Sequence, residues 1–144
     1  MASIGKGTST IKNVPMSEDV NTTIGCLQQL GINIARTGST VTVEGRGFAG
    51  LKAPRDALDC RESGTTARTL VGLIAGAGIK AVLSARGSLI SRPMDRVVAP
   101  LSLMGAEFSP GSTFPLTLLE NPGLHGVDYA LPVASAQVKT AILL

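Results

Sequence analysis

Residues 17–50, SEDVNTTIGCLQQLGINIARTGSTVTVEGRGFAG, decide the fold, because the same order of elements returns once later in the chain. Apolar residues recur at helical spacing from Val20 to Leu30, and a glycine follows as the expected helix end. Two short strands joined by a Gly-Ser-Thr turn come next, at Ile32–Ala35 and Thr40–Glu44. The stretch therefore predicts a helix followed by a strand pair.

A second copy of this arrangement begins at Ser91. Its apolar positions from Met94 to Met104 have the same helical spacing, and a glycine, a strand at Ala106–Phe108 and another Gly-Ser-Thr turn follow in the same order. A period of roughly seventy residues exceeds the range of solenoid repeats. Several matches in register predict a duplicated α/β unit, with copies at approximately 10–60 and 80–130.

Composition favours one globular domain over residues 1–144. The chain is 44% hydrophobic and 16% charged, which suits a real core built from aliphatic side chains, since aromatic residues make up only 3%. The formal net charge is +3, with no run of basic residues and no aromatic residues among them, which argues against nucleic acid as a partner and fits a small anion better. No apolar run approaches the roughly 18 residues that span a bilayer, and no signal peptide is recognisable. We therefore expect a cytoplasmic protein without a membrane partner.

The other elements are less strongly marked. Residues 1–8 are expected to be a frayed lead-in, followed by a short strand at Thr10–Asn13. A helix with its body at Ala67–Ala75 is apolar nearly all round and should be buried. A strand at Lys80–Ser84, a third helix beginning at Arg92-Pro93 and a fourth from Ser135 complete the pattern. That fourth helix is still apolar at the last residue, which is typical of a segment of a longer protein.

The starts of the four predicted helices are the candidate sites for chemistry, because each follows a serine (Ser17, Ser63, Ser91 and Ser135). Free N–H groups and the positive dipole end make a helix start attractive to anions. Ordinary capping is the better interpretation of Ser17. The other three starts add Gly64 with neighbouring hydroxyls, the guanidinium of Arg92 and the amide of Gln137. A solvated surface arginine is the alternative for Arg92. We expect these three starts to converge at one sheet edge.

Familiar catalytic sets are not recognisable. His125 stands alone in a glycine-flanked loop and is expected to be structural. No Ser-His-Asp set, nucleotide-binding glycine fingerprint or metal-ligand cluster can be assembled. Cys26 and Cys60 lack metal-like spacing and are expected to be reduced core residues.

Three blocks resemble the EPSP synthase (3-phosphoshikimate 1-carboxyvinyltransferase) family over nearly the whole chain. They are LDCRESGTTAR at 58–68, SRPMDRVVAPL at 91–101 and LPVASAQVKTA at 131–141. The resemblance implies an α/β fold of repeated βαβαββ units arranged as an inside-out barrel, with this chain forming part of one domain. It also implies transfer of the enolpyruvyl group of phosphoenolpyruvate to the 5-hydroxyl of shikimate 3-phosphate in aromatic amino-acid biosynthesis. The expected mechanism is protonation-assisted addition and then elimination, with no metal or organic cofactor.

The resemblance also implies roles for particular residues. Gly64 and Arg92 would contact phosphoenolpyruvate, and Gln137 would reach both ligands. Ser135 and, through its backbone, Ala136 would lie at shikimate 3-phosphate. Thr65 is a further substrate-binding candidate. No catalytic acid or base is assigned within the chain.

Two departures from the family pattern stand out. The block before Gly64 usually reads Gly-Asn, and here it reads Arg61-Glu62, so a carboxylate would oppose phosphoenolpyruvate and mimics such as glyphosate unless a base pairs with it. The family's lysine-bearing loop is expected before residue 1, and the second domain, with the acid and base carboxylates, after Leu144. We therefore expect the chain alone to be inactive without the remainder of the enzyme.

Two alternatives remain open on the sequence alone. One is a non-catalytic anion-binding or scaffold module that reuses the duplicated unit and does not prefer shikimate 3-phosphate over simple phosphate. The other is an enolpyruvyl transferase that acts on a nucleotide sugar, against which the Ser135-Ala-Gln137 block argues.

Overall fold

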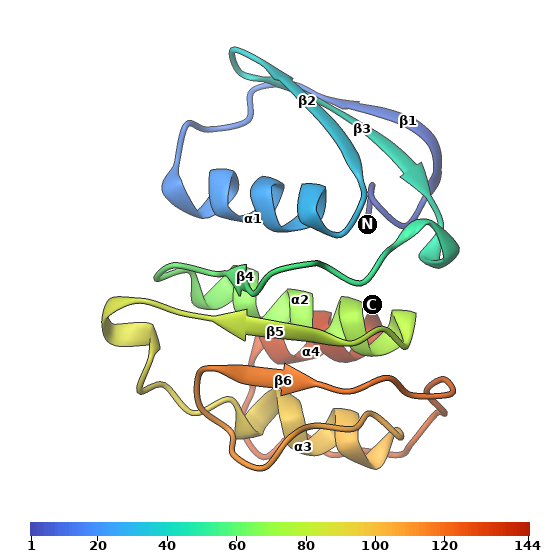
Figure 1. The fold of residues 1–144 in the computed structure, drawn as a ribbon, viewed down its shortest axis with the longest axis vertical. Coiled ribbons are helices and arrows are strands. Elements are labelled where there is room, and N and C mark those ends of the chain that lie inside the picture. Colours follow the sequence, from blue (N-terminus) through green and yellow to red (C-terminus); the bar gives the residue numbers. More distant parts are fainter.

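Two small sheets with their helices form the architecture of residues 1–144 in the computed structural model (Figure 1). The strands are β1 (Lys6–Ile11), β2 (Asn33–Thr37), β3 (Thr40–Arg46), β4 (Leu58–Asp59), β5 (Ala81–Ser84) and β6 (Leu116–Leu118). The helices are α1 (Glu18–Gln29), α2 (Gly64–Ala77), α3 (Asp95–Leu103) and α4 (Ala136–Leu143), and the short 3-10 turns are η1 (Phe48–Gly50) and η2 (Gly87–Leu89). No helix is long and apolar enough to cross a membrane.

The first sheet has the strand order β1-β3-β2 and is antiparallel throughout. Val41 and Val43 are buried on its inner face, as their alternation predicts, and Ile34 of β2 lies opposite Val43. Helix α1 covers this face (Figure 1). Ser17 caps α1, with its hydroxyl accepting a hydrogen bond from the Val20 amide at 3.3 Å, so the expectation of an ordinary cap is confirmed.

The second sheet has the order β4-β5-β6, with β4 parallel and β6 antiparallel to β5. Phe108 adds an antiparallel bridge to Leu118, so a single strand position follows α3 before β6. From β4 to β6 the order is thus strand, helix, strand, helix, strand position, strand, which is one βαβαββ unit.

Both sheets use the same pairing scheme around α1 and α3. In the first, β1 pairs with β3 and β3 pairs with β2; in the second, β5 pairs with β6 and β6 pairs with Phe108. Because strand order and pairing recur together, we propose that approximately 10–60 and 80–130 are copies of one unit within a partial domain.

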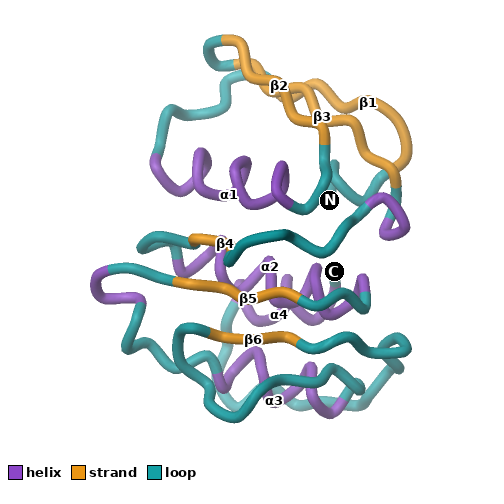
Figure 2. The backbone as a smooth tube through the Cα atoms, viewed as in Figure 1, coloured by secondary structure: helices purple, strands orange, loops and turns teal.

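Helix α2 is the centre of the hydrophobic core. Leu70, Val71 and Ile74 are among its eight buried residues, which confirms the prediction of a helix apolar nearly all round. Helix α4 runs beside α2 (Figure 2), and a side chain at Gly72 would collide with the backbone of Ala141. The absence of a side chain at this glycine allows the two helices to approach closely.

Two predicted boundaries are wrong. Strand β1 begins at Lys6, within the segment expected to be frayed, because Lys6 already pairs with Arg46 of β3. Most residues of β1 are exposed and show no apolar alternation, so the sequence carries no local signal for the strand. Helix α3 begins at Asp95 with Met94 at the N-cap, so neither Ser91 nor Arg92 starts it. The residue before a proline is disfavoured in helical conformation, and Pro93 therefore keeps Arg92 outside the helix.

Candidate anion-binding site

The starts of α2 and α4 are built in the same way. Ser63 and Ser135 are the N-caps, and their hydroxyls accept hydrogen bonds at 3.3 Å from the amides of Thr66 and Val138 respectively. A direct contact joins the two starts, because the Gln137 side-chain Nε2 donates to Thr65 Oγ1 at 2.9 Å. Two of the three predicted anion-attracting starts thus converge.

Arg68 fixes the orientation of the Gln137 amide. Its Nη1 donates to Gln137 Oε1 at 3.1 Å and to the backbone oxygen of Gly64 at 3.2 Å. The amide oxygen therefore faces a cation while the amide nitrogen faces Thr65. This arrangement holds the side chains of both helix starts in one network.

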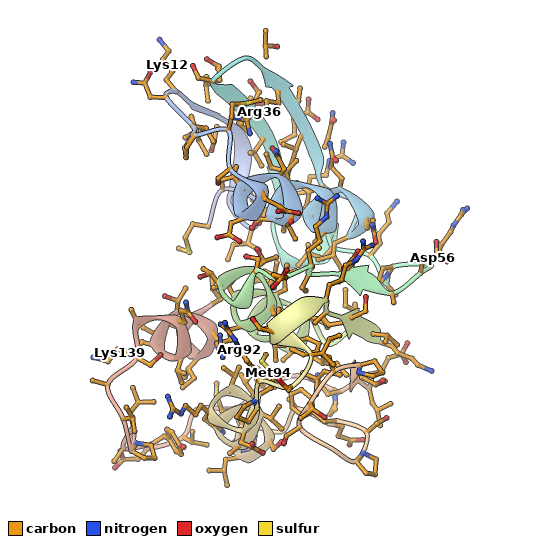
Figure 3. All side chains as sticks on the ribbon, turned by 90° about the vertical axis from the view of Figure 1, so that its left-hand side faces the viewer. Lys12, Arg36, Asp56, Arg92, Met94 and Lys139 are labelled. Carbon is orange, nitrogen blue, oxygen red and sulfur yellow. The ribbon has the colours of Figure 1, made fainter.

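A cavity of about 300 Å³ lies beside this network. Its lining residues are Arg68, Arg92, Pro93, Arg96, Ser135, Gln137 and Val138. Figure 3 shows Arg92 in the space between α2, α3 and α4. Arg92 lies before α3 rather than at its first turn, but it lines the same cavity as Ser135 and Gln137, and its Nη2 donates to Ser88 Oγ at 3.1 Å.

The cavity is strongly electropositive. Three guanidinium groups line it, and none of them forms an ion pair with a carboxylate, since the chain's salt bridges involve Arg46, Arg61 and Arg86. Burial, and then the charges of Arg92 and Arg96, lower the pKa of Arg68 below its ordinary value. An anion in the cavity would relieve this repulsion and receive charge-assisted hydrogen bonds.

Gly64 leaves room for the arginines. A Cβ atom at this position would lie 2.7 Å from Arg68 Nη1 and 3.8 Å from Arg92 Nη1. The glycine therefore matters for space, and its φ is not in the left-handed region.

The structure brings most of the predicted site residues together. Arg92, Ser135 and Gln137 line the cavity, and Gly64 and Thr65 contact the network behind it. Ala136 is the first residue of α4 and is exposed, so its backbone amide lies at the helix start.

Sequence reasoning missed Arg68 and Arg96, which also line the cavity. Each lies four residues beyond a predicted site residue, Gly64 or Arg92. On a helix, that spacing returns a side chain to the same face. It was the available signal for Arg68, which shares α2 with Gly64.

Glu62 does not line the cavity. Its Oε2 accepts a hydrogen bond from the Ser88 amide at 3.4 Å, and Arg61 pairs with Glu18 at 3.0 Å instead of with Glu62. Ser88 of turn η2 thus contacts Glu62 through its amide and Arg92 through its hydroxyl. His125 lies beside Gly105, away from the cavity, and no cluster of three or more His, Cys, Asp or Glu residues is arranged to hold a metal ion.

Comparison with known sequences decides the family. The sequence profile described as EPSP synthase (3-phosphoshikimate 1-carboxyvinyltransferase) matches residues 1–144. The chain belongs to the EPSP synthase family. Relatives named 3-phosphoshikimate 1-carboxyvinyltransferase include those of Roseiflexus sp. RS-1, which is 48% identical, and Enterococcus faecalis V583, which is 44% identical. These alignments cover 98% and 97% of this chain, and 33% and 34% of the respective relatives.

A solved EPSP synthase structure from Acinetobacter baumannii has the same fold. It superposes with a TM-score of 0.92 at 36% sequence identity, over 99% of this chain and 33% of that one. The expected α/β fold of the EPSP synthase family is therefore confirmed. The chain spans about a third of the length of the relatives it matches.

Proposed function

We propose that residues 1–144 form the anion-binding part of an EPSP synthase. That enzyme would transfer the enolpyruvyl group of phosphoenolpyruvate to the 5-hydroxyl of shikimate 3-phosphate and release phosphate. Membership of the family supports this activity. The observation that carries the proposal is the cavity in which unpaired arginines meet the starts of α2 and α4.

Each residue then has a physical task. Arg92 pairs with the anionic groups of phosphoenolpyruvate, and Gly64, whose missing side chain leaves room for Arg68, contacts the same ligand. Ser135 and the Ala136 amide hold shikimate 3-phosphate at the start of α4, where free N–H groups favour a phosphate. Gln137 lies between the two ligands, and Thr65 keeps its amide oriented.

Binding and proton transfer are divided between different parts of the enzyme. The cavity is lined by arginines, a serine and an amide, none of which is a general acid or base near neutral pH. We therefore expect the 144-residue chain to bind anions without turnover. The acid and base groups come from the remainder of the enzyme, its main partner, and we place that enzyme in the cytoplasm.

An NMR titration of the chain with shikimate 3-phosphate tests the proposal, with inorganic phosphate and a uridine-diphosphate sugar as comparison ligands. We expect shikimate 3-phosphate to shift the amides of Thr65, Ser135 and Gln137 at lower concentration than phosphate does. In a second titration, with phosphoenolpyruvate, the Arg92→Gln variant should respond more weakly than the wild type.

Two other outcomes of the first titration would each favour one of the alternative functions. Equal responses to shikimate 3-phosphate and phosphate would contradict the proposal and favour a simple anion-binding module. A selective response to the nucleotide sugar would assign the chain to another enolpyruvyl transferase.

A further inference from the structure

Arg96 is the one cavity arginine with no partner of its own. Arg68 donates to Gln137 and Gly64, and Arg92 donates to Ser88. Arg96 makes no side-chain hydrogen bond, and no carboxylate lies within salt-bridge distance of it. All five of its N–H donors are therefore free for a ligand.

The position of Arg96 places it on the wall of the cavity. It is the second residue of α3 and lines the same 300 Å³ space as Arg68 and Arg92. It also borders a smaller hollow lined mainly by apolar residues, among them Leu131 and Val138. Arg96 thus separates an apolar space from a cationic one, an arrangement that suits an arginine, whose stem is apolar and whose head is charged.

We propose that Arg96 is a third anion-binding residue of this cavity, which gives the site enough positive charge for a doubly charged phosphate monoester. The proposal rests on the proposed function, because it concerns the same cavity. Physically, the attraction between Arg96 and a ligand grows in proportion to the ligand's charge, so a dianion gains twice what a monoanion gains. A surface arginine without a role would be expected to find a carboxylate or to lie away from two like charges.

Phosphate binding to five versions of the chain provides the test. Inorganic phosphate is titrated at pH 8, where the dianion predominates, into the wild type, Arg96→Gln, Arg96→Lys, Arg92→Gln and Arg55→Gln, with amide shifts at Ser135 and Gln137 as the readout. Arg55 is exposed, is not paired and lies outside the cavity, so its variant has the same net charge as Arg96→Gln. Arg96 is itself exposed, and its replacement leaves the core intact.

We expect Arg96→Gln to weaken phosphate binding about tenfold, the equivalent of one charged hydrogen bond. Arg96→Lys should recover part of this loss, and Arg55→Gln should stay within about twofold of the wild type, since distant exposed charges are screened. In the wild type, the Nε–H signal of Arg96 should shift on phosphate addition.

The outcomes that would refute the role of Arg96 can be distinguished from those that would refute the proposed function. If Arg92→Gln weakens binding while Arg96→Gln does not, the role of Arg96 is refuted and the proposed function stands. If Arg96→Gln and Arg55→Gln lose the same amount of phosphate affinity, the change in net charge alone explains the loss, and the role of Arg96 is refuted as well. If the wild type does not respond to phosphate or to shikimate 3-phosphate, both proposals fail.

Discussion

At the scale of single residues, Arg61 is under backbone strain. Its φ of 49° lies in the left-handed region, which costs an L-residue about 1–2 kcal/mol. EPSP synthases usually have glycine at this place, by the pattern described above. The ion pair with Glu18 joins two exposed side chains and offsets little of this cost.

We expect Arg61→Gly to raise the free energy of unfolding by about 0.5 kcal/mol, since relief of strain exceeds the added flexibility of the unfolded chain. Urea denaturation measures this change. Arg55→Gly is the control, because Arg55 does not have a positive φ and should only lose stability. A lower stability of Arg61→Gly than of the wild type would show that the Glu18 pair matters more than the strain.

Gly64 permits a second test at this scale. A methyl group in Gly64→Ala would displace Arg68 Nη1 and break its contact with Gln137, so phosphate binding should weaken about tenfold. Calorimetric or NMR titration measures this loss. Gly25→Ala in α1 is the matched control, because nothing lies within 4 Å of its added Cβ. Unchanged affinity in Gly64→Ala would mean that Arg68 does not hold the site in shape.

At the scale of elements, the contact between α2 and α4 sets the geometry of the site from a distance. Gly72 lies four residues beyond the cavity-lining Arg68 on α2, and a methyl group at Gly72 would meet the Ala141 backbone. We expect Gly72→Ala to destabilise the fold by about 1–3 kcal/mol through overpacking and to weaken phosphate binding at the same time. Thermal unfolding and a phosphate titration check both effects. Full affinity in a destabilised variant would show that α4 repacks without moving its first turn.

Sequence reasoning succeeded where local chemistry determines the element. Serine caps mark α1, α2 and α4, and alternation marks β3, because these signals act within a few residues. Strand β1 has no such signal, since its partner β3 is distant in the sequence. The start of α3 depends on competition between a cap and Pro93.

The residues of the candidate site could likewise be predicted only where the signal is local. Gly64, Arg92 and Gln137 could be named from helix starts and from the family resemblance. The spacing from Gly64 indicates the helix face on which Arg68 lies, but the meeting of that face with Arg92 and Arg96 depends on how α2, α3 and α4 pack around the cavity. Such packing is a long-range property that spacing along the chain does not encode.

At the scale of the whole molecule, two buried thiols lie where the half with the first sheet and α1 meets the half with the second sheet (Figure 1). Cys26 belongs to α1 and its Sγ lies 3.7 Å from the Asp59 oxygen of β4, while Cys60 follows that strand. Each thiol donates to a backbone oxygen, Cys26 to Asp59 and Cys60 to Leu58. The neighbouring Cys60 thiol lowers the pKa of Cys26, and the neighbouring Cys26 thiol together with burial raises the pKa of Cys60. Both are free thiols, as the sequence predicts.

We expect a thiol reagent to label neither cysteine in the folded chain, because both are fully enclosed. Labelling rates measured over a series of urea concentrations should give both thiols the same free energy of opening as global unfolding. Rapid labelling without urea would show that the two halves separate easily. Labelling of Cys26 alone would show that α1 detaches first.

Anion binding in the cavity should stabilise the folded chain. The walls of the cavity come from α2, from α3 and the segment before it, and from α4, so a bound anion contacts parts of the fold that are distant in the sequence. A ligand that binds only the folded state adds about 2.7 kcal/mol at one hundred times its dissociation constant. Differential scanning calorimetry should therefore show a midpoint that rises with phosphate in the wild type and rises less in Arg92→Gln. The folded population of this chain then depends on the phosphate and phosphate-ester content of its surroundings.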